Sequence, residues 1–226
     1  MYNSDIKELL EHCLIEIEKI SKEKKASSIN KVALKNVLEN MRSILDYIAQ
    51  DILNKLKQNP KNNKLSNKIY FPYGQKENHF KISIKRNLPN LKKDMPELYD
   101  LIESIQPFKL KNNWIVDLCE LTNEAKHNNL SKTKDDKSIT VKNKLGNITA
   151  SKNLVMQNNY VNGIKQDDIF FDGEEVRVVE NIGESEITIK NKIKFHGKEL
   201  EIVPFLTNCF ENLEQLSIEV SSLLSE

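Results

Sequence analysis

Three side chains that could take part in chemistry stand close together in residues 118–130, namely Asn123, Lys126 and His127. An imidazole beside a cation and an amide can act as a general base, or stabilise charge, where a ribose hydroxyl attacks a phosphodiester. That chemistry needs no metal ion. Asn123 and His127 are four residues apart, so on a helix they share one flank with Cys119. We therefore treat Asn123, Lys126 and His127 as candidate catalytic residues of a metal-independent ribonuclease.

Arg42 and Asp46 form a second candidate group on a strongly periodic segment. A rotation of about 100° per residue places Arg42 inside the apolar arc of a helix and Asp46 at its margin. A guanidinium buried alone is costly, so Arg42 requires a carboxylate or a bound anion. Two interpretations follow: Arg42 pairs with Asp46 at the edge of the core, or Arg42 holds a phosphate.

A single histidine on a helix is also typical of a hydrogen-bonded or surface residue, so a structural interpretation of His127 stands beside the catalytic one. The other histidines, His12, His79 and His196, show no metal-ligand spacing with cysteine. The sequence contains no glycine-rich phosphate loop and no nucleophile elbow. We therefore predict neither a metal site nor a cofactor.

The periodicity of apolar residues predicts the helices that would position these side chains. The clearest helix covers about residues 29–57, with Ser27 or Ser28 as its cap, and another long helix covers about 113–130 with Trp114 and Leu118 in its core stripe. We also expect a first helix capped by Ser4, a short helix near 97–105 and a closing helix from 204. The segment 69–74, IYFPYG, suits an extended piece at an edge.

After residue 131 the apolar period changes to two, which is typical of strands. We expect strands near 139–141, 147–156, 169–171, 176–179, 186–195 and 199–203, with a hairpin turn at Asp172-Gly173. The predicted fold class is α+β: a mainly helical four-helix bundle with an antiparallel β meander inserted before the last helix. We expect one domain over 1–226, made of a helical core (1–131), a β-rich insertion (132–203) and a closing helix (204–226).

The composition favours a globular protein without a strong overall electrostatic field. The chain carries 34 basic and 33 acidic residues, a net charge of +1, so a polyanion would have to bind to a local patch. The three cysteines are far apart and embedded in helical patterns, which is typical of reduced core residues. No segment approaches the roughly 18 apolar residues of a membrane span. We expect a cytoplasmic protein that does not bind membranes.

Four motifs occur in order along the chain: MRSILDYIAQD, IYFPYG, LYDLIESIQPF and LCELTNEAKHNNLS. Together they resemble a group of bacterial proteins without an assigned function that share RSxLD, FP, QP and LTNxxKH motifs. This resemblance covers about residues 37–131. More distantly, the helical layout resembles the HEPN superfamily, whose members are small helical bundles.

The HEPN resemblance implies homodimerisation, and in many members metal-independent ribonuclease activity in toxin–antitoxin or phage-defence systems. The superfamily signature is an Arg, commonly followed by Asn, with a His four residues further on. Asn123 and His127 keep this spacing, but Thr122 stands at the Arg position. Two functions therefore remain open. One is a non-enzymatic binding or dimerisation module with an RNA or protein partner. The other is a ribonuclease in which Arg42 or Lys126 supplies the missing charge.

Overall fold

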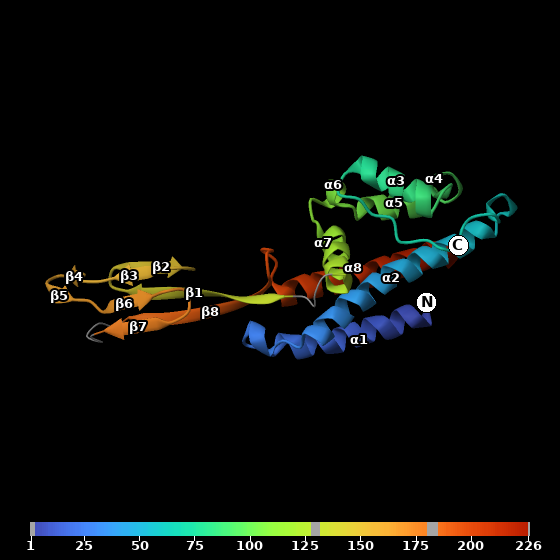
Figure 1. Ribbon diagram of the computed structural model, residues 1–226. Coiled ribbons are helices and arrows are strands. Elements are labelled where there is room, and N and C mark those ends of the chain that lie inside the picture. Colours follow the sequence, from blue (N-terminus) through green and yellow to red (C-terminus); the bar gives the residue numbers. More distant parts are fainter. Residues whose placement is uncertain (1–2, 128–131, 180–184, 226) are drawn as a thin grey trace. The chain divides into compact units, whose positions relative to one another are not determined.

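The computed structural model of the chain describes residues 3–127, 132–179 and 185–225. The described chain is a mixture of helices and antiparallel strands (Figure 1). It divides into two compact units. The helical unit contains residues 1–23, 29–132 and 202–226, and the β unit contains residues 24–28 and 133–201.

Long helices form the framework of the helical unit: α1 (Ser4–Ser21), α2 (Lys31–Lys57), α7 (Trp114–His127) and α8 (Ile202–Ser225). Helix α2 packs against α1, α7 and α8, and α8 also packs against α1 and α7. Their apolar residues form a buried core, in which Leu38, Met41, Leu45 and Ile48 of α2 are almost fully inaccessible. The three-to-four spacing that predicts α2 is therefore the spacing of its buried face.

The shorter helices of this unit lie between α2 and α7 in the sequence, and α3, α4, α5 and α6 form a group of their own (Figure 1). They are η2 (Pro60–Asn62), α3 (Glu77–Asn87), α4 (Leu91–Asp94), α5 (Pro96–Ser104) and α6 (Pro107–Leu110). Proline occupies the first turn of α5 and α6, where its missing N–H costs no hydrogen bond. The predicted short helix at 97–105 is present as α5.

Several predicted helix boundaries differ from the structure. The cap of α1 is Asn3, whose side chain accepts from Asp5 N, and the cap of α2 is Asn30, which accepts from Val32 N and Ala33 N. Asparagine caps as well as serine, so propensity does not separate neighbouring candidates. The weakly alternating stretch 79–84 lies inside helix α3, where Phe80 and Ile84 are buried at helical spacing.

The β unit contains the helical turn η1 (Ala26–Ser28) and two three-stranded antiparallel sheets. The first sheet has the order β2 (Gly146–Ala150), β1 (Thr133–Asn143), β8 (Glu186–Phe195). The second has the order β3 (Leu154–Met156), β6 (Asp168–Phe171), β7 (Val176–Val179). The short strands β4 (Tyr160–Val161) and β5 (Ile164–Lys165) pair separately.

This topology corrects the predicted meander, because the first strand pairs with the last. Thr133 lies opposite Phe195, and the register continues to Lys142 opposite Glu186. Two other strand predictions were also wrong. The single strand at 147–156 is divided into β2 and β3, and 199–203 forms only a bridge between Lys194 and Glu201 before α8 begins at Ile202. The Asp172-Gly173 hairpin is confirmed, since β6 and β7 pair across it.

The β unit has its own small hydrophobic core. Ile139 and Val141 of β1 pack with Met156, Ile169 and Phe171 of the second sheet. These residues alternate with more exposed neighbours, as expected for strands with one covered face. Among the described residues, no helix is both long enough and apolar enough to cross a membrane.

Candidate functional site

A cavity of about 340 Å³ opens in the helical unit, and residues from α2, segment 69–74, α3 and α7 line it. Four of the five candidate residues from the sequence line this cavity: Arg42, Asp46, Asn123 and Lys126. Three of the four sequence motifs contribute lining residues, and Gln106 of the fourth, the QP motif, accepts a hydrogen bond from Gly74 at the end of segment 69–74. We refer to this cavity as the Arg42 pocket.

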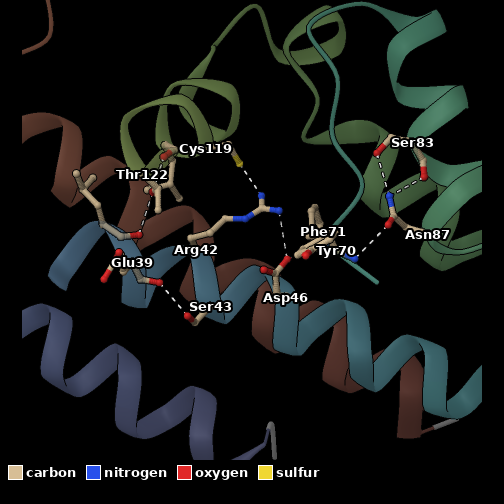
Figure 2. Close-up of polar contacts among 12 residues, drawn as sticks. Glu39, Arg42, Ser43, Asp46, Tyr70, Phe71, Ser83, Asn87, Cys119 and Thr122 are labelled. Carbon is tan, nitrogen blue, oxygen red and sulfur yellow. Dashed lines mark hydrogen bonds and ion pairs between the residues drawn. The ribbon is translucent and has the colours of Figure 1, made fainter. Parts of the chain in front are cut away.

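Arg42 projects from α2 toward α7 and makes three contacts (Figure 2). Its Nη2 atom lies 3.3 Å from Asp46 Oδ1, and its Nη1 atom donates to the sulfur of Cys119. The guanidinium carbon also lies 5.2 Å from the centre of the Tyr73 ring, which is within cation–π range. The side chain of Arg42 is only 14% exposed, so these contacts offset the cost of burying its charge.

Asp46 connects this arginine to the backbone of the FP motif. Besides pairing with Arg42, its Oδ1 atom accepts a 2.9 Å hydrogen bond from Phe71 N (Figure 2). Phe71 itself is fully buried. The Arg42–Asp46 pair expected from the i to i+4 spacing is therefore present, and it also anchors an extended segment.

Two further side chains hold the same segment. Asn87 of α3 accepts from Tyr70 N at 3.1 Å and donates to the Ser83 carbonyl at 3.0 Å (Figure 2). Gln106, which is fully buried, accepts from Gly74 N at 3.0 Å and donates to the Ile102 carbonyl at 2.9 Å. The backbone N–H groups of segment 69–74 thus donate to side chains, whereas those of a strand in a sheet would donate to a neighbouring strand.

Gly74 is required where this segment meets α3. A Cβ atom at position 74 would lie 2.3 Å from Phe80 N, closer than any non-bonded contact permits. This close approach packs the start of α3 against the segment. Helix α3 in turn contributes Ser83, Arg86 and Asn87 to the lining of the pocket. Gly74 therefore helps to position the pocket wall, although Gly74 itself does not line the pocket.

Cys119 lies beneath Arg42 and is almost fully buried. Burial raises the pKa of its thiol to about 11, and the nearby Arg42 guanidinium opposes part of that rise. Burial also raises the pKa of the Tyr73 phenol, which hydrogen-bonds with Cys119. Both groups are therefore neutral at physiological pH, and Cys119 is not an activated nucleophile.

The charges on the described lining residues are unequal. Arg42, Arg86 and Lys126 are cationic, whereas Asp46 is the single carboxylate on this lining. Arg86 and Lys126 are exposed, and neither has an acidic partner within the part of the chain that the structure describes. The carboxylate of Asp46 already forms an ion pair with Arg42 and accepts a hydrogen bond from Phe71 N. The pocket rim thus presents an excess of positive charge.

The sequence-predicted residues of α7 occupy different places. Asn123 and Lys126 are exposed on the pocket side of the helix, one and two helical turns after Cys119 respectively. The backbone of His127 ends α7, but its side chain lies outside the described residues. The structure therefore brings Asn123 and Lys126 to Arg42 and Asp46.

Thr122, which stands at the signature Arg position, faces the core. It is 1% exposed, and its hydroxyl donates to the Leu118 carbonyl at 2.7 Å and the Leu38 carbonyl at 3.3 Å (Figure 2). It thereby joins α7 to α2 on the side away from the pocket. A guanidinium at this position would enter the core rather than the cavity.

Sequence analysis did not identify Arg86, Tyr73 or Gln106 as site residues. A signal existed for Arg86, because the chain has arginine only at positions 42, 86 and 177 among many lysines. Two of these three arginines line the same pocket. Nothing in the local sequence relates Arg86 to Arg42, since their proximity depends on how α3 packs.

Among the described residues, no group of three or more His, Cys, Asp or Glu side chains is placed to hold a metal ion. Comparison of the chain with protein-family models, with curated proteins and with solved structures finds no match.

Proposed function

We propose that the protein is a cytoplasmic binding module whose Arg42 pocket holds a phosphate group of an RNA partner. The observation that carries this proposal is the charge on the lining: three cations face one carboxylate that is already paired. Arginine and lysine side chains clustered around a cavity are the usual ligands of phosphate oxygens. The nearly neutral chain supplies no general attraction for polyanions, so this local charge would determine where RNA binds.

The proposed division of roles among the three cations follows from their exposure. Arg42 is held rigidly by Asp46, Cys119 and Tyr73, so it would position a phosphate at the pocket floor with little loss of entropy. Arg86 and Lys126 are exposed and would close on the phosphate from α3 and α7. The Tyr70 side chain lines the same pocket and is 49% exposed, which offers a ring on which a base could stack.

Binding of a labelled single-stranded RNA oligonucleotide, followed by fluorescence anisotropy, tests this proposal. Arg86→Gln and Lys126→Gln should each weaken binding about 3- to 10-fold and each reduce the salt dependence, because each removes about one phosphate contact. Lys85→Gln is the matched control, because Lys85 is an exposed neighbour of Arg86 that does not line the pocket. Equal loss in Lys85→Gln, or no binding by the wild-type protein, would reject the proposal.

A ribonuclease is the second candidate function, because Asn123 and Lys126 line the same pocket as Arg42. In this candidate His127, the next residue after Lys126, acts as the acid or base and the cations hold the scissile phosphate. Total RNA incubated with the protein in EDTA should be cleaved, and His127→Ala should abolish cleavage. Binding without cleavage, or equal cleavage by both proteins, would leave only the binding module.

The HEPN resemblance leads us to propose also that the long helices form a HEPN-like bundle that homodimerises, in a toxin–antitoxin or phage-defence setting. The mutual packing of α1, α2, α7 and α8 is compatible with such a bundle. Sedimentation equilibrium at micromolar concentration should then give twice the 26.2 kDa chain mass. A monomer under these conditions would contradict the dimer without affecting the proposal for the RNA pocket.

A further inference from the structure

A second cavity, of about 380 Å³, lies among α1, α2 and α8 of the helical unit. Its size falls in the range of pockets that bind small molecules. Asp51 of α2 and the N-cap residue Asn3 form one side, and hydroxyls of α8, including Ser217 and Ser221, form another. It shares no lining residue with the Arg42 pocket.

Several polar side chains of this cavity present hydrogen-bond acceptors. The hydroxyl of Ser217 donates to the Leu213 carbonyl at 2.7 Å, and that of Ser225 donates to the Ser221 carbonyl at 2.8 Å. A hydroxyl whose proton is already donated offers only its lone pairs. The Asn3 amide, the one strong donor among the described lining residues, is directed at the Asp51 oxygens from 3.4 and 3.5 Å.

The carboxylate of Asp51 lacks a cationic partner within the described chain. Lys55 lies one turn further along α2, at the spacing suited to an ion pair, but its Nζ atom donates to the Leu224 carbonyl at 2.8 Å. The bonds from Asn3 exceed the usual length of an N–H···O bond and leave lone pairs of Asp51 unused. Burial raises the pKa of Asp51 above its ordinary value, as expected for a carboxylate without a charged partner.

The remaining lining is aliphatic. Ile6, Ile48 and Val220 reach the cavity from the three helices, and each is at most 3% exposed. Described lining residues include no lysine or arginine, in contrast to the Arg42 pocket. A ligand that fits these walls carries a positively charged hydrogen-bond donor at one end and an alkyl chain at the other.

We propose that this cavity binds a small primary alkylammonium ion, with Asp51 and the serine hydroxyls of α8 receiving the ammonium group and Ile6, Ile48 and Val220 covering the alkyl chain. An ammonium group brings three donors, which matches a site made of acceptors. A charge-assisted bond to Asp51 is stronger than one between neutral groups. The site is independent of the proposed RNA pocket and needs no catalytic step.

Titration of the full-length protein with n-butylammonium chloride, followed by two-dimensional NMR, tests this site. Saturable shifts should appear at the backbone amides of Ser217 and Ser221. Asp51→Asn should weaken binding at least about 10-fold, and n-butanol, which has the alkyl chain without the charge, should bind at least as weakly. Asp100→Asn, at an exposed aspartate of α5, is the matched control and should bind like the wild-type protein.

A second variant tests the site independently, in case Asp51→Asn fails to fold. Ser221→Leu leaves the charge of Asp51 intact and fills the cavity, so it should also abolish the shifts while the spectrum remains that of a folded protein. The proposal is overturned if butylammonium causes no saturable shifts, if Asp51→Asn binds equally well, or if n-butanol binds as tightly as butylammonium. Shifts confined to surface residues away from α8 would overturn it as well.

Discussion

Thr122 is the residue at which the resemblance to the HEPN signature and the packing of this chain disagree most directly. The hydroxyl is bonded to the Leu118 carbonyl within α7 and to the Leu38 carbonyl of α2, and the side chain is buried. Arg42 approaches α7 from the neighbouring helix and places a guanidinium at Cys119, one turn before Asn123. A guanidinium from α2 therefore lies against α7 at Cys119.

Restoring the signature with Thr122→Arg should destabilise the fold rather than create a catalytic site. A guanidinium forced into the core without a partner costs about 3–5 kcal/mol of unfolding free energy. Asn123→Arg is the matched control, because Asn123 is exposed on the same turn, and its stability should change by no more than about 0.5 kcal/mol. Urea denaturation measures both. A stable Thr122→Arg protein would contradict the placement of Thr122 in the core.

Cys119 should make the protein sensitive to alkaline pH. Its pKa rises from 9.0 to about 11 on folding, so the folded state holds the thiol proton more tightly than the unfolded state does. The resulting stabilisation is fully present below pH 9 and is lost as the pH rises through 11, and it amounts to on the order of 2 kcal/mol. Cys119→Ala should lose less stability than the wild-type protein between pH 8 and 10.5. The other buried thiols are common to both proteins, so parallel pH profiles would refute this role.

At the scale of elements, segment 69–74 holds the pocket together without forming a helix or a sheet. Asp46 of α2, Asn87 of α3 and Gln106 before α6 each accept from one of its backbone N–H groups. These three anchors come from elements far apart in the sequence, and two of them, Asp46 and Gln106, belong to motifs. The FP and QP motifs are thus joined directly by the hydrogen bond from Gly74 N to Gln106.

Gln106→Ala should therefore weaken the whole helical unit. The substitution leaves Gly74 N buried without an acceptor, which costs about 1–3 kcal/mol, and it adds a small cavity. Gln75→Ala is the control, since Gln75 is an exposed glutamine in the same stretch whose bond to Asn113 lies at the surface. Chemical denaturation compares the two variants. Equal stability of Gln106→Ala and Gln75→Ala would show that the anchor contributes nothing.

At the scale of the whole molecule, the long segment of the β unit, residues 133–201, begins and ends at neighbouring positions, and the short segment 24–28 bonds to its first strand. Thr133 lies opposite Phe195, and Glu201 bridges to Lys194, which itself lies opposite Lys134. Adjacent strands are about 5 Å apart, so two strand spacings separate the two ends of the β unit. Each unit also has a buried core of its own. A short linker can therefore replace residues 134–200 and keep the chain of the helical unit continuous.

Replacing residues 134–200 by a Gly-Ser linker of about six residues, long enough for that gap, should leave the helical unit folded. We expect a cooperative thermal transition at 222 nm and RNA binding within about 3-fold of the intact protein. A control with the linker joined after residue 125 removes the end of α7, including Lys126, and should bind RNA at least as weakly as Lys126→Gln does. Loss of cooperative unfolding in the first variant would show that the two units depend on each other for folding.

Sequence alone determined the periodic elements. The apolar spacing of α2 and α7 and the Asp172-Gly173 hairpin depend on residues within a few turns of each other. The Arg42–Asp46 ion pair was one of two interpretations that the sequence allowed, and the structure shows it. Tertiary structure decided the rest, because non-local packing leaves no period in the sequence. It paired β1 with β8, turned Thr122 into the core and brought Arg86 of α3 to Arg42. It also placed Asp51 of α2 in a cavity that α1 and α8 help to line, and this position makes Asp51 a candidate binding residue.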